Sequence, residues 1–162
     1  MLYKRYIIAL IVFLTACEEM ERHVILRQID FEVDPQANKG EAFVCHLVVP
    51  YSIDLDQRLR GMDAQTYFTQ LTDLQKTYKD TLEIFRYDLI PGKNKLNQKV
   101  EPRSRFRAKG AYVFAKYSSP GRFAERIGLY NKVLVQFSSH KMELQNDFNL
   151  KKWTKSIEQK IA

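Results

Sequence analysis

The stretch Ala42-Phe-Val-Cys-His-Leu-Val-Val49 decides the fold of this chain. It is a short run of apolar and β-branched residues that ends at Pro50, and such a run is typical of a buried strand. Because successive side chains of a strand alternate between its two faces, four of them share one apolar face. These are Phe43, Cys45, Leu47 and Val49. Cys45 is therefore expected to be a buried and inert thiol.

Similar runs recur along the chain, separated by clusters of Pro, Gly, Asn, Asp and Ser. The predicted strands are 24–33, 42–49, 51–59, 82–90, 93–100, 111–117, 131–137 and 142–145. The segment 51–59 alternates only in part and is predicted to be an edge-like strand. The segment 111–117 is strongly apolar, and its Phe114 is expected to face the interior between two sheets. This spacing of strands and turns predicts a mainly β fold, a two-sheet β-sandwich.

One short helix is predicted to be inserted among the strands. Its apolar positions recur at steps of three and four residues, and Asp63 precedes them as a candidate N-cap. They are Ala64, Tyr67, Phe68, Leu71, Leu74 and Tyr78, and we interpret this stripe as core packing. A C-terminal helix is also predicted, because Trp153, Ile157 and Ile161 follow one another at four-residue steps.

The composition is that of a single globular domain. The chain has 162 residues, of which 45% are hydrophobic and 28% charged, and this excludes a disordered or low-complexity polymer. Two cysteines exclude a disulfide-dense scaffold. The 26 Lys and Arg outnumber the 19 Asp and Glu, which gives a net charge of +7. The basic run 103–109 is interpreted as a solvated loop, with contact to an anionic partner or to lipid headgroups as the functional alternative.

The N-terminus has the pattern of a bacterial lipoprotein signal peptide. Lys4 and Arg5 precede the apolar run 7–14, which is too short to cross a membrane, and the box Leu14-Thr15-Ala16-Cys17 follows. In such a box the Cys thiol is the nucleophile that receives a diacylglyceryl group, and the peptidase cuts just before it. Without the two signal-peptide cations the charge of +7 falls to +5, so no nucleic-acid partner is expected.

Lipidation at Cys17 predicts both the organisation of the chain and its location. Residues 1–16 are the predicted signal peptide, 17–22 a tether, and 23–162 one sandwich domain with a tail from about 146. Two or more acyl chains give stable anchoring, whereas a single chain is marginal. Glu18, rather than Asp, follows the lipidated residue, and this favours the periplasmic face of the outer membrane.

The residues that carry chemistry form no recognisable site. His23, His46 and His140 have no metal-ligand spacing, and the neighbours Cys45 and His46 point to opposite faces of a strand. No phosphate loop, dinucleotide fingerprint or nucleophile elbow is present in the sequence. We therefore expect no enzyme activity, no metal, and no cofactor apart from the covalent lipid at Cys17.

The order of these features resembles TssJ, the outer-membrane lipoprotein of type VI secretion systems. That family has a lipobox Cys, a strand, a polar loop and a second strand, then a helix with an aromatic three residues before a Leu, a Pro-Gly pair and an apolar strand. The similar features here are Cys17, 24–33, 34–41, 42–49, Phe68 with Leu71, Pro91-Gly92, and 111–117. This chain differs after the apolar strand, where it has Phe123, Arg126 and Ile127 in place of the family's frequent Trp-Arg pair.

The resemblance implies a transthyretin-like sandwich without catalytic activity that anchors a secretion envelope complex to the outer membrane. In that family the loop between the first two strands binds the periplasmic domain of TssM, the large inner-membrane component. Carried over to this chain, the partner-binding residues are Asp34, Pro35, Gln36, Ala37, Asn38, Lys39 and Gly40. Pro35 is expected to act by limiting backbone freedom, and Asn38 by offering hydrogen-bond donors and acceptors.

Two other classes of function stay open at this point. One is a lipoprotein of another envelope machine, such as type IV secretion or a pilus, and the other is a periplasmic module that binds a ligand or glycan. The loop 34–40 itself could be a plain solvated hairpin connection, since its residues offer almost nothing to bury. On this reasoning, replacing it by a two-residue Asn-Gly turn is expected to leave folding intact.

Overall fold

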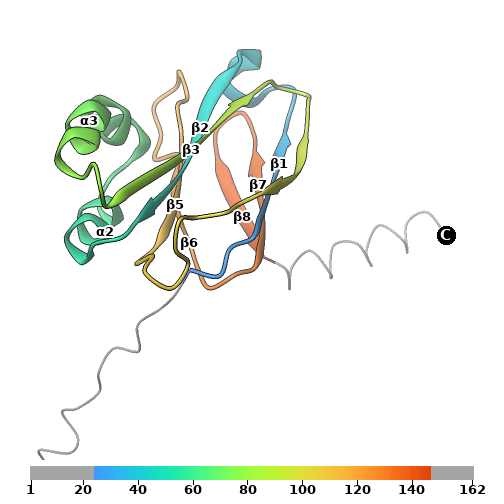
Figure 1. The fold of residues 1–162 in the computed structure, drawn as a ribbon. Helices are drawn as coiled ribbons and strands as arrows, with labels where there is room; N and C mark the ends of the chain where they lie inside the picture. Colours follow the sequence, from blue (N-terminus) through green and yellow to red (C-terminus); the bar gives the residue numbers. More distant parts are fainter. Residues whose placement is uncertain (1–23, 147–162) are drawn as a thin grey trace, which may run out of the picture.

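The computed structural model of the protein describes residues 24–146 (Figure 1). The predicted signal peptide, the lipidation residue Cys17, the tether and the predicted C-terminal helix lie outside the described residues.

The described chain forms two four-stranded sheets, with strand orders β4-β1-β7-β8 and β3-β2-β5-β6, and this confirms the predicted two-sheet β-sandwich. The first strand, β1, pairs in parallel with β7, and the other neighbouring strands pair antiparallel. In chain order the elements are β1 (Gln28–Val33), the 3-10 turn η1 (Ala37–Gly40), β2 (Phe43–Pro50), α2 (Ile53–Arg60), α3 (Ala64–Thr77), β3 (Leu82–Leu89), β4 (Lys95–Lys99), β5 (Ala111–Ala115), β6 (Ala124–Ile127), β7 (Lys132–Phe137) and β8 (Met142–Asn146).

The core between the sheets contains the apolar face that the sequence predicts for β2. Cys45 and Leu47 are fully buried, and Tyr87, which pairs with Cys45 on β3, contacts Phe31 of the other sheet at 4.7 Å between ring centroids. Burial raises the pKa of the Cys45 thiol far above its usual value. The thiolate is therefore disfavoured, as expected for an inert core cysteine.

The outer face of the β3-β2-β5-β6 sheet carries a third layer made of α2 and α3, which Figure 1 shows on the left. The prediction of α3 is confirmed, including its N-cap, because the Asp63 side chain accepts a hydrogen bond from Thr66 N–H at 2.7 Å. The prediction of an edge strand at 51–59 is wrong. This segment forms the helix α2, which is capped by Ser52. The buried side chains Leu55 and Leu59 of the helix recur at a four-residue step.

Phe114 is buried, but not between the sheets as predicted. It pairs with His46 of β2 and stacks on Tyr67 of α3, with ring centroids 4.1 Å apart and planes 11° apart. Both faces of β5 are covered, one by the opposing sheet and the other by α3, so all five of its residues are buried. An apolar run of this kind does not reveal which side faces which layer.

The loop after β1 crosses from one sheet to the other, because β1 and β2 belong to different sheets. It is not a hairpin connection. The strand β6, which pairs with β5, was not predicted from the sequence, since its Glu125 and Arg126 interrupt the apolar pattern.

Candidate partner-binding site

The loop predicted to bind a partner is an ordered turn at one end of the sandwich, near the top of Figure 1. The Asp34 carboxylate accepts a hydrogen bond from Gln36 N–H at 2.7 Å, and Asp34 C=O accepts one from Ala37 N–H at 2.9 Å. Asp34 N–H donates to Phe137 C=O at 3.0 Å, which holds the start of the loop against β7. Local and long-range hydrogen bonds together therefore fix its shape.

Asn38 is the centre of this turn, with only 3% of its surface exposed. Its Nδ2 donates to Glu41 C=O at 3.1 Å, and its Oδ1 accepts from Ser118 N–H at 2.6 Å. The side chain thus joins the loop to the segment after β5. Its expected role as a donor and acceptor for a partner does not fit this burial, because these groups are used inside the protein.

The turn reverses direction through three consecutive residues in the left-handed region. Asn38, Lys39 and Gly40 have φ values of 48°, 59° and 80°. Asn and Gly tolerate this region well, whereas Lys does so at a cost of about 1 kcal/mol. The buried Ala37 and Asn38 hold the turn in place, contrary to the expectation that the loop has almost nothing to bury.

The exposed edge of the loop consists of Asp34, Pro35, Gln36, Lys39 and Gly40. Asp34 and Pro35 also line a groove of about 450 Å³, together with Gly92, Asn94 and Lys141 from the neighbouring turns. We call this edge and groove the η1 surface. Its backbone is fixed by the contacts above, and a fixed loop on a rigid sheet loses little conformational entropy on binding.

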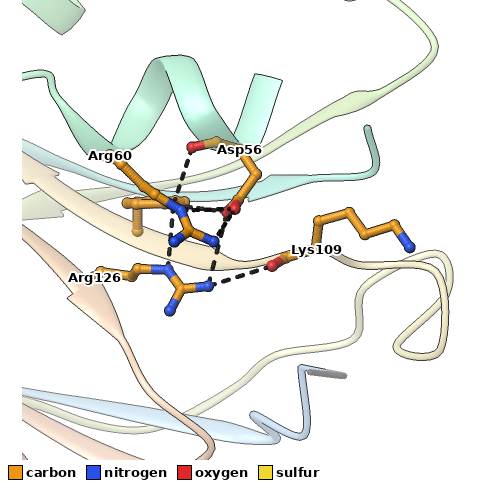
Figure 2. Close-up of polar contacts among 5 residues, drawn as sticks. Asp56, Arg60, Lys109 and Arg126 are labelled. Atoms are coloured by element: carbon orange, nitrogen blue, oxygen red, sulfur yellow. Dashed lines mark hydrogen bonds and ion pairs between the residues drawn. The ribbon is translucent and has the colours of Figure 1, made fainter. Parts of the chain in front are cut away.

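A second cluster of polar residues lies under α2 and is shown in Figure 2. The buried Asp56 accepts hydrogen bonds from Arg60 Nη2 and Tyr112 Oη, each at 2.6 Å, and Arg126 Nη2 lies 3.9 Å from Asp56 Oδ1. Arg126 Nη2 also donates to Lys109 C=O at 3.4 Å. Burial and the Asp56 bond raise the pKa of Tyr112 to about 12. Every group is paired, so the cluster fastens α2 to the sheet.

Candidates for chemistry are otherwise few among residues 24–146. His46 is buried under α3, with Nδ1 3.0 Å from Tyr67 Oη, and burial followed by the Arg86 charge lowers its pKa to about 4. It lies on the opposite face of β2 from Cys45, as predicted. Within the described residues, no group of three His, Cys, Asp or Glu could hold a metal ion, and no helix is long and apolar enough to span a membrane.

The Asp56 cluster is not predicted from the sequence, because the cluster joins residues from three separate segments of the chain. A signal for the helix that carries Asp56 was present, however. Ser52 stands before acidic residues in the first turn, Asp54 and Asp56, and basic residues follow in the last turn, Arg58 and Arg60. This distribution of charge complements a helix dipole.

Comparison with solved structures identifies the architecture. The Lip protein of Serratia marcescens, a membrane-bound component of the type VI secretion system, superposes with a TM-score of 0.55 at 14% identity, over 75% of this chain and 96% of that chain. The lipoprotein TssJ1 of Pseudomonas aeruginosa gives 0.56 at 14% identity, over 74% and 93%. A chain of a type VI membrane complex gives 0.56 at 17% identity, over 75% and 98%.

The fold is that of type VI secretion lipoproteins. Both the predicted sandwich and the resemblance to TssJ are supported by these matches, which span nearly the whole of each TssJ-like chain. No protein-family model matches the sequence, and no curated protein matches it. At these identities the similarity shows the fold alone.

Proposed function

We propose that this protein is the outer-membrane lipoprotein of a type VI secretion envelope complex, held on the periplasmic face by lipid at Cys17. The proposal is supported by two independent features that occur together in this chain, its lipobox and its fold. The sequence has a four-residue lipobox, and the domain after it has the fold of type VI secretion lipoproteins over 93% to 98% of their length.

The proposed role is binding and not catalysis. The η1 surface contacts the periplasmic domain of a large inner-membrane component, and the acyl chains hold the other end of the assembly at the outer membrane. Support comes from the shape of the loop, which is fixed by internal hydrogen bonds while its edge stays exposed. Such a surface suits recognition by a folded partner.

Acylation is tested by metabolic labelling with a fatty-acid analogue. The wild-type protein should carry the label, and Cys17→Ser should lack it and accumulate as the unprocessed precursor. Label that persists on Cys17→Ser would contradict the anchor.

The partner is tested by capture of the tagged protein from gently solubilised envelopes, followed by mass spectrometry. We expect one dominant, very large inner-membrane protein encoded with type VI secretion genes. Recovery of pilus or type IV secretion components, or of a glycan alone, would support the other classes of function instead.

A further inference from the structure

Three segments meet at the end of the domain where the described chain begins and ends, along the lower edge of Figure 1. Arg27 N–H donates to Asn131 C=O at 2.8 Å, and Val100 N–H donates to Arg27 C=O at 2.9 Å. These bonds join the chain start, the segment after β4 and the turn before β7. We call residues 24–27, 99–109 and 128–132 the tether face.

The tether face is strongly cationic. Between residues 99 and 109 there are five Lys and Arg and a single carboxylate, Glu101. A cavity of about 650 Å³ at this end has Arg27, Lys99, Arg105 and Lys132 among its lining residues. Lys132 is paired with Asp30 at 3.0 Å, whereas the side chains of Arg27 and Lys99 are exposed.

Part of the basic run is held in place, contrary to the prediction of a solvated loop. Arg105 is partly buried, and its Nη2 donates to Val100 C=O at 2.8 Å. Its Nε donates to Leu26 C=O at 3.4 Å. Arg103 donates through its backbone N–H to the Glu83 carboxylate at 3.1 Å. The run is therefore an ordered platform beside the start of the described chain.

Exposed apolar side chains gather on the same face. Seven large hydrophobic residues are exposed in the described chain, and four of them belong to the tether face. They are Ile25, Phe106, Leu129 and Tyr130, and Phe106 is the most exposed at 80%. Apolar and aromatic side chains among cations are typical of a surface that lies at the boundary between headgroups and acyl chains.

We propose that the tether face lies directly on the bilayer and binds its anionic phospholipid headgroups, which rests on the proposed lipidation at Cys17. The seven residue-to-residue steps from Cys17 to Val24 can span at most about 25 Å when fully extended. The anchor therefore holds this face close to the membrane. The cations meet lipid phosphates, and Phe106 enters the interfacial layer.

Charge complementarity favours the membrane over other occupants of this face. The chain's own tail has Lys151, Lys152, Lys155 and Lys160 against Asp147 and Glu158, so it is not complementary to a cationic surface. A second copy would bring like charges together.

Contact with the bilayer would also orient the domain. The η1 surface lies at the opposite end of the sandwich and would therefore face the periplasm (Figure 1).

The test uses the mature polypeptide from Glu18 to Ala162 without acyl chains, since this contains every described residue and does not depend on acylation. Sedimentation with vesicles of phosphatidylethanolamine and phosphatidylglycerol is compared with sedimentation with phosphatidylcholine vesicles. Each cation near an anionic surface strengthens binding about five-fold. We expect binding to the anionic vesicles only, and a loss of at least about tenfold in the triple variant Arg27→Gln, Lys99→Gln and Arg107→Gln.

The matched control removes the same charge from the opposite end, by Lys39→Gln, Lys93→Gln and Lys141→Gln. It should bind anionic vesicles as the unaltered protein does. Equal binding to both kinds of vesicle, or an equal loss in the two triple variants, would overturn the proposal. Failure of acylation would appear only in the labelling of Cys17, so the two results are separate.

The position of Phe106 provides a second readout. In a Trp153→Phe background, Phe106→Trp places a single tryptophan on the tether face. Brominated lipid in anionic vesicles should quench its fluorescence and shift its emission to the blue. A water-exposed emission with no quenching in vesicles that bind the protein would contradict insertion of this side chain.

Discussion

Asn38 Oδ1 accepts a hydrogen bond from Ser118 N–H at 2.6 Å, and this bond joins the turn after β1 to the segment after β5. The η1 surface therefore depends on a residue that a partner cannot reach. Its exposed edge is available for binding, while its buried centre sets the shape of that edge.

Asn38→Ala should lower the free energy of unfolding by about 2–3 kcal/mol. The substitution removes two hydrogen bonds and places a residue with a Cβ and no local polar group in the left-handed region. Urea denaturation measures the loss. Lys39→Ala is the matched control, because it has similar backbone strain before and after the change and should alter stability by about 0.5 kcal/mol or less. Equal effects in the two variants would show that the Asn38 amide is unimportant.

Replacement of residues 34–40 by Asn-Gly should prevent folding, which reverses the expectation from the sequence. A two-residue turn connects hydrogen-bonded neighbours in one sheet, but β1 and β2 lie in different sheets, which pack about 10 Å apart. Circular dichroism during urea titration should show no cooperative unfolding transition. A native-like transition in the shortened protein would mean that the loop crossing is wrong.

Asp56→Asn should destabilise the protein by about 2 kcal/mol, since the buried Asp56 carboxylate accepts a charge-assisted hydrogen bond from the partly exposed Arg60 and a second bond from Tyr112. Asp54→Asn on the same helix is the control, and it should cost under about 1 kcal/mol because the amide can still accept from Tyr78 Oη. Gly110→Ala is a second probe, since an added Cβ would lie 2.3 Å from Asp56 Oδ1. Chemical denaturation that gives the same midpoint for all three variants would exclude a stabilising role for the cluster.

His46 should make stability depend on pH between about 6.5 and 4. Burial and the positive charges of Arg86 and Lys116 lower its pKa to about 4, against an opposing effect of Asp88, so in this range the unfolded chain binds the proton and the folded chain does not. The free energy of unfolding is highest above pH 6.5 and decreases as the pH falls towards 4, by up to about 3 kcal/mol. Urea midpoints of the wild type and of His46→Gln, measured across this range, isolate the effect. Parallel curves would indicate that His46 titrates normally.

The strands that the sequence predicts well are those whose pattern is local. The apolar runs that became β2, β5 and β7 and the capped stripe of α3 are visible in consecutive residues. The sequence predicts a strand where α2 lies, because the helix has few buried apolar positions, Leu55 and Leu59, and its remaining residues are mostly charged. The predicted side of β5 for Phe114 is wrong, because a strand buried on both faces has no polar side that would indicate which face meets the other sheet.

The site was only partly predictable for a related reason. The sequence marks 34–40 as a loop, but strand pairing is a long-range property, and nothing in those residues tells that β1 and β2 separate into different sheets. The bond between Asn38 and Ser118 joins residues that are 80 positions apart. The same holds for Asp56 and Tyr112, which are 56 positions apart. Such pairs are set by topology and not by local pattern.

Partner binding through the η1 surface is tested most directly by the affinity of the mature protein for the periplasmic domain of the captured inner-membrane component. Gln36→Trp with Lys39→Glu alters the exposed edge of the η1 surface without touching Asn38. Gln75→Trp with Lys79→Glu makes the same chemical changes at exposed positions at the end of α3 and beyond it. Both variants should unfold at the wild-type urea midpoint. Binding measured by calorimetry should weaken at least about tenfold for the η1 variant, as for a central interface position, and stay unchanged for the control. Wild-type affinity in a folded η1 variant would contradict partner binding through the η1 surface.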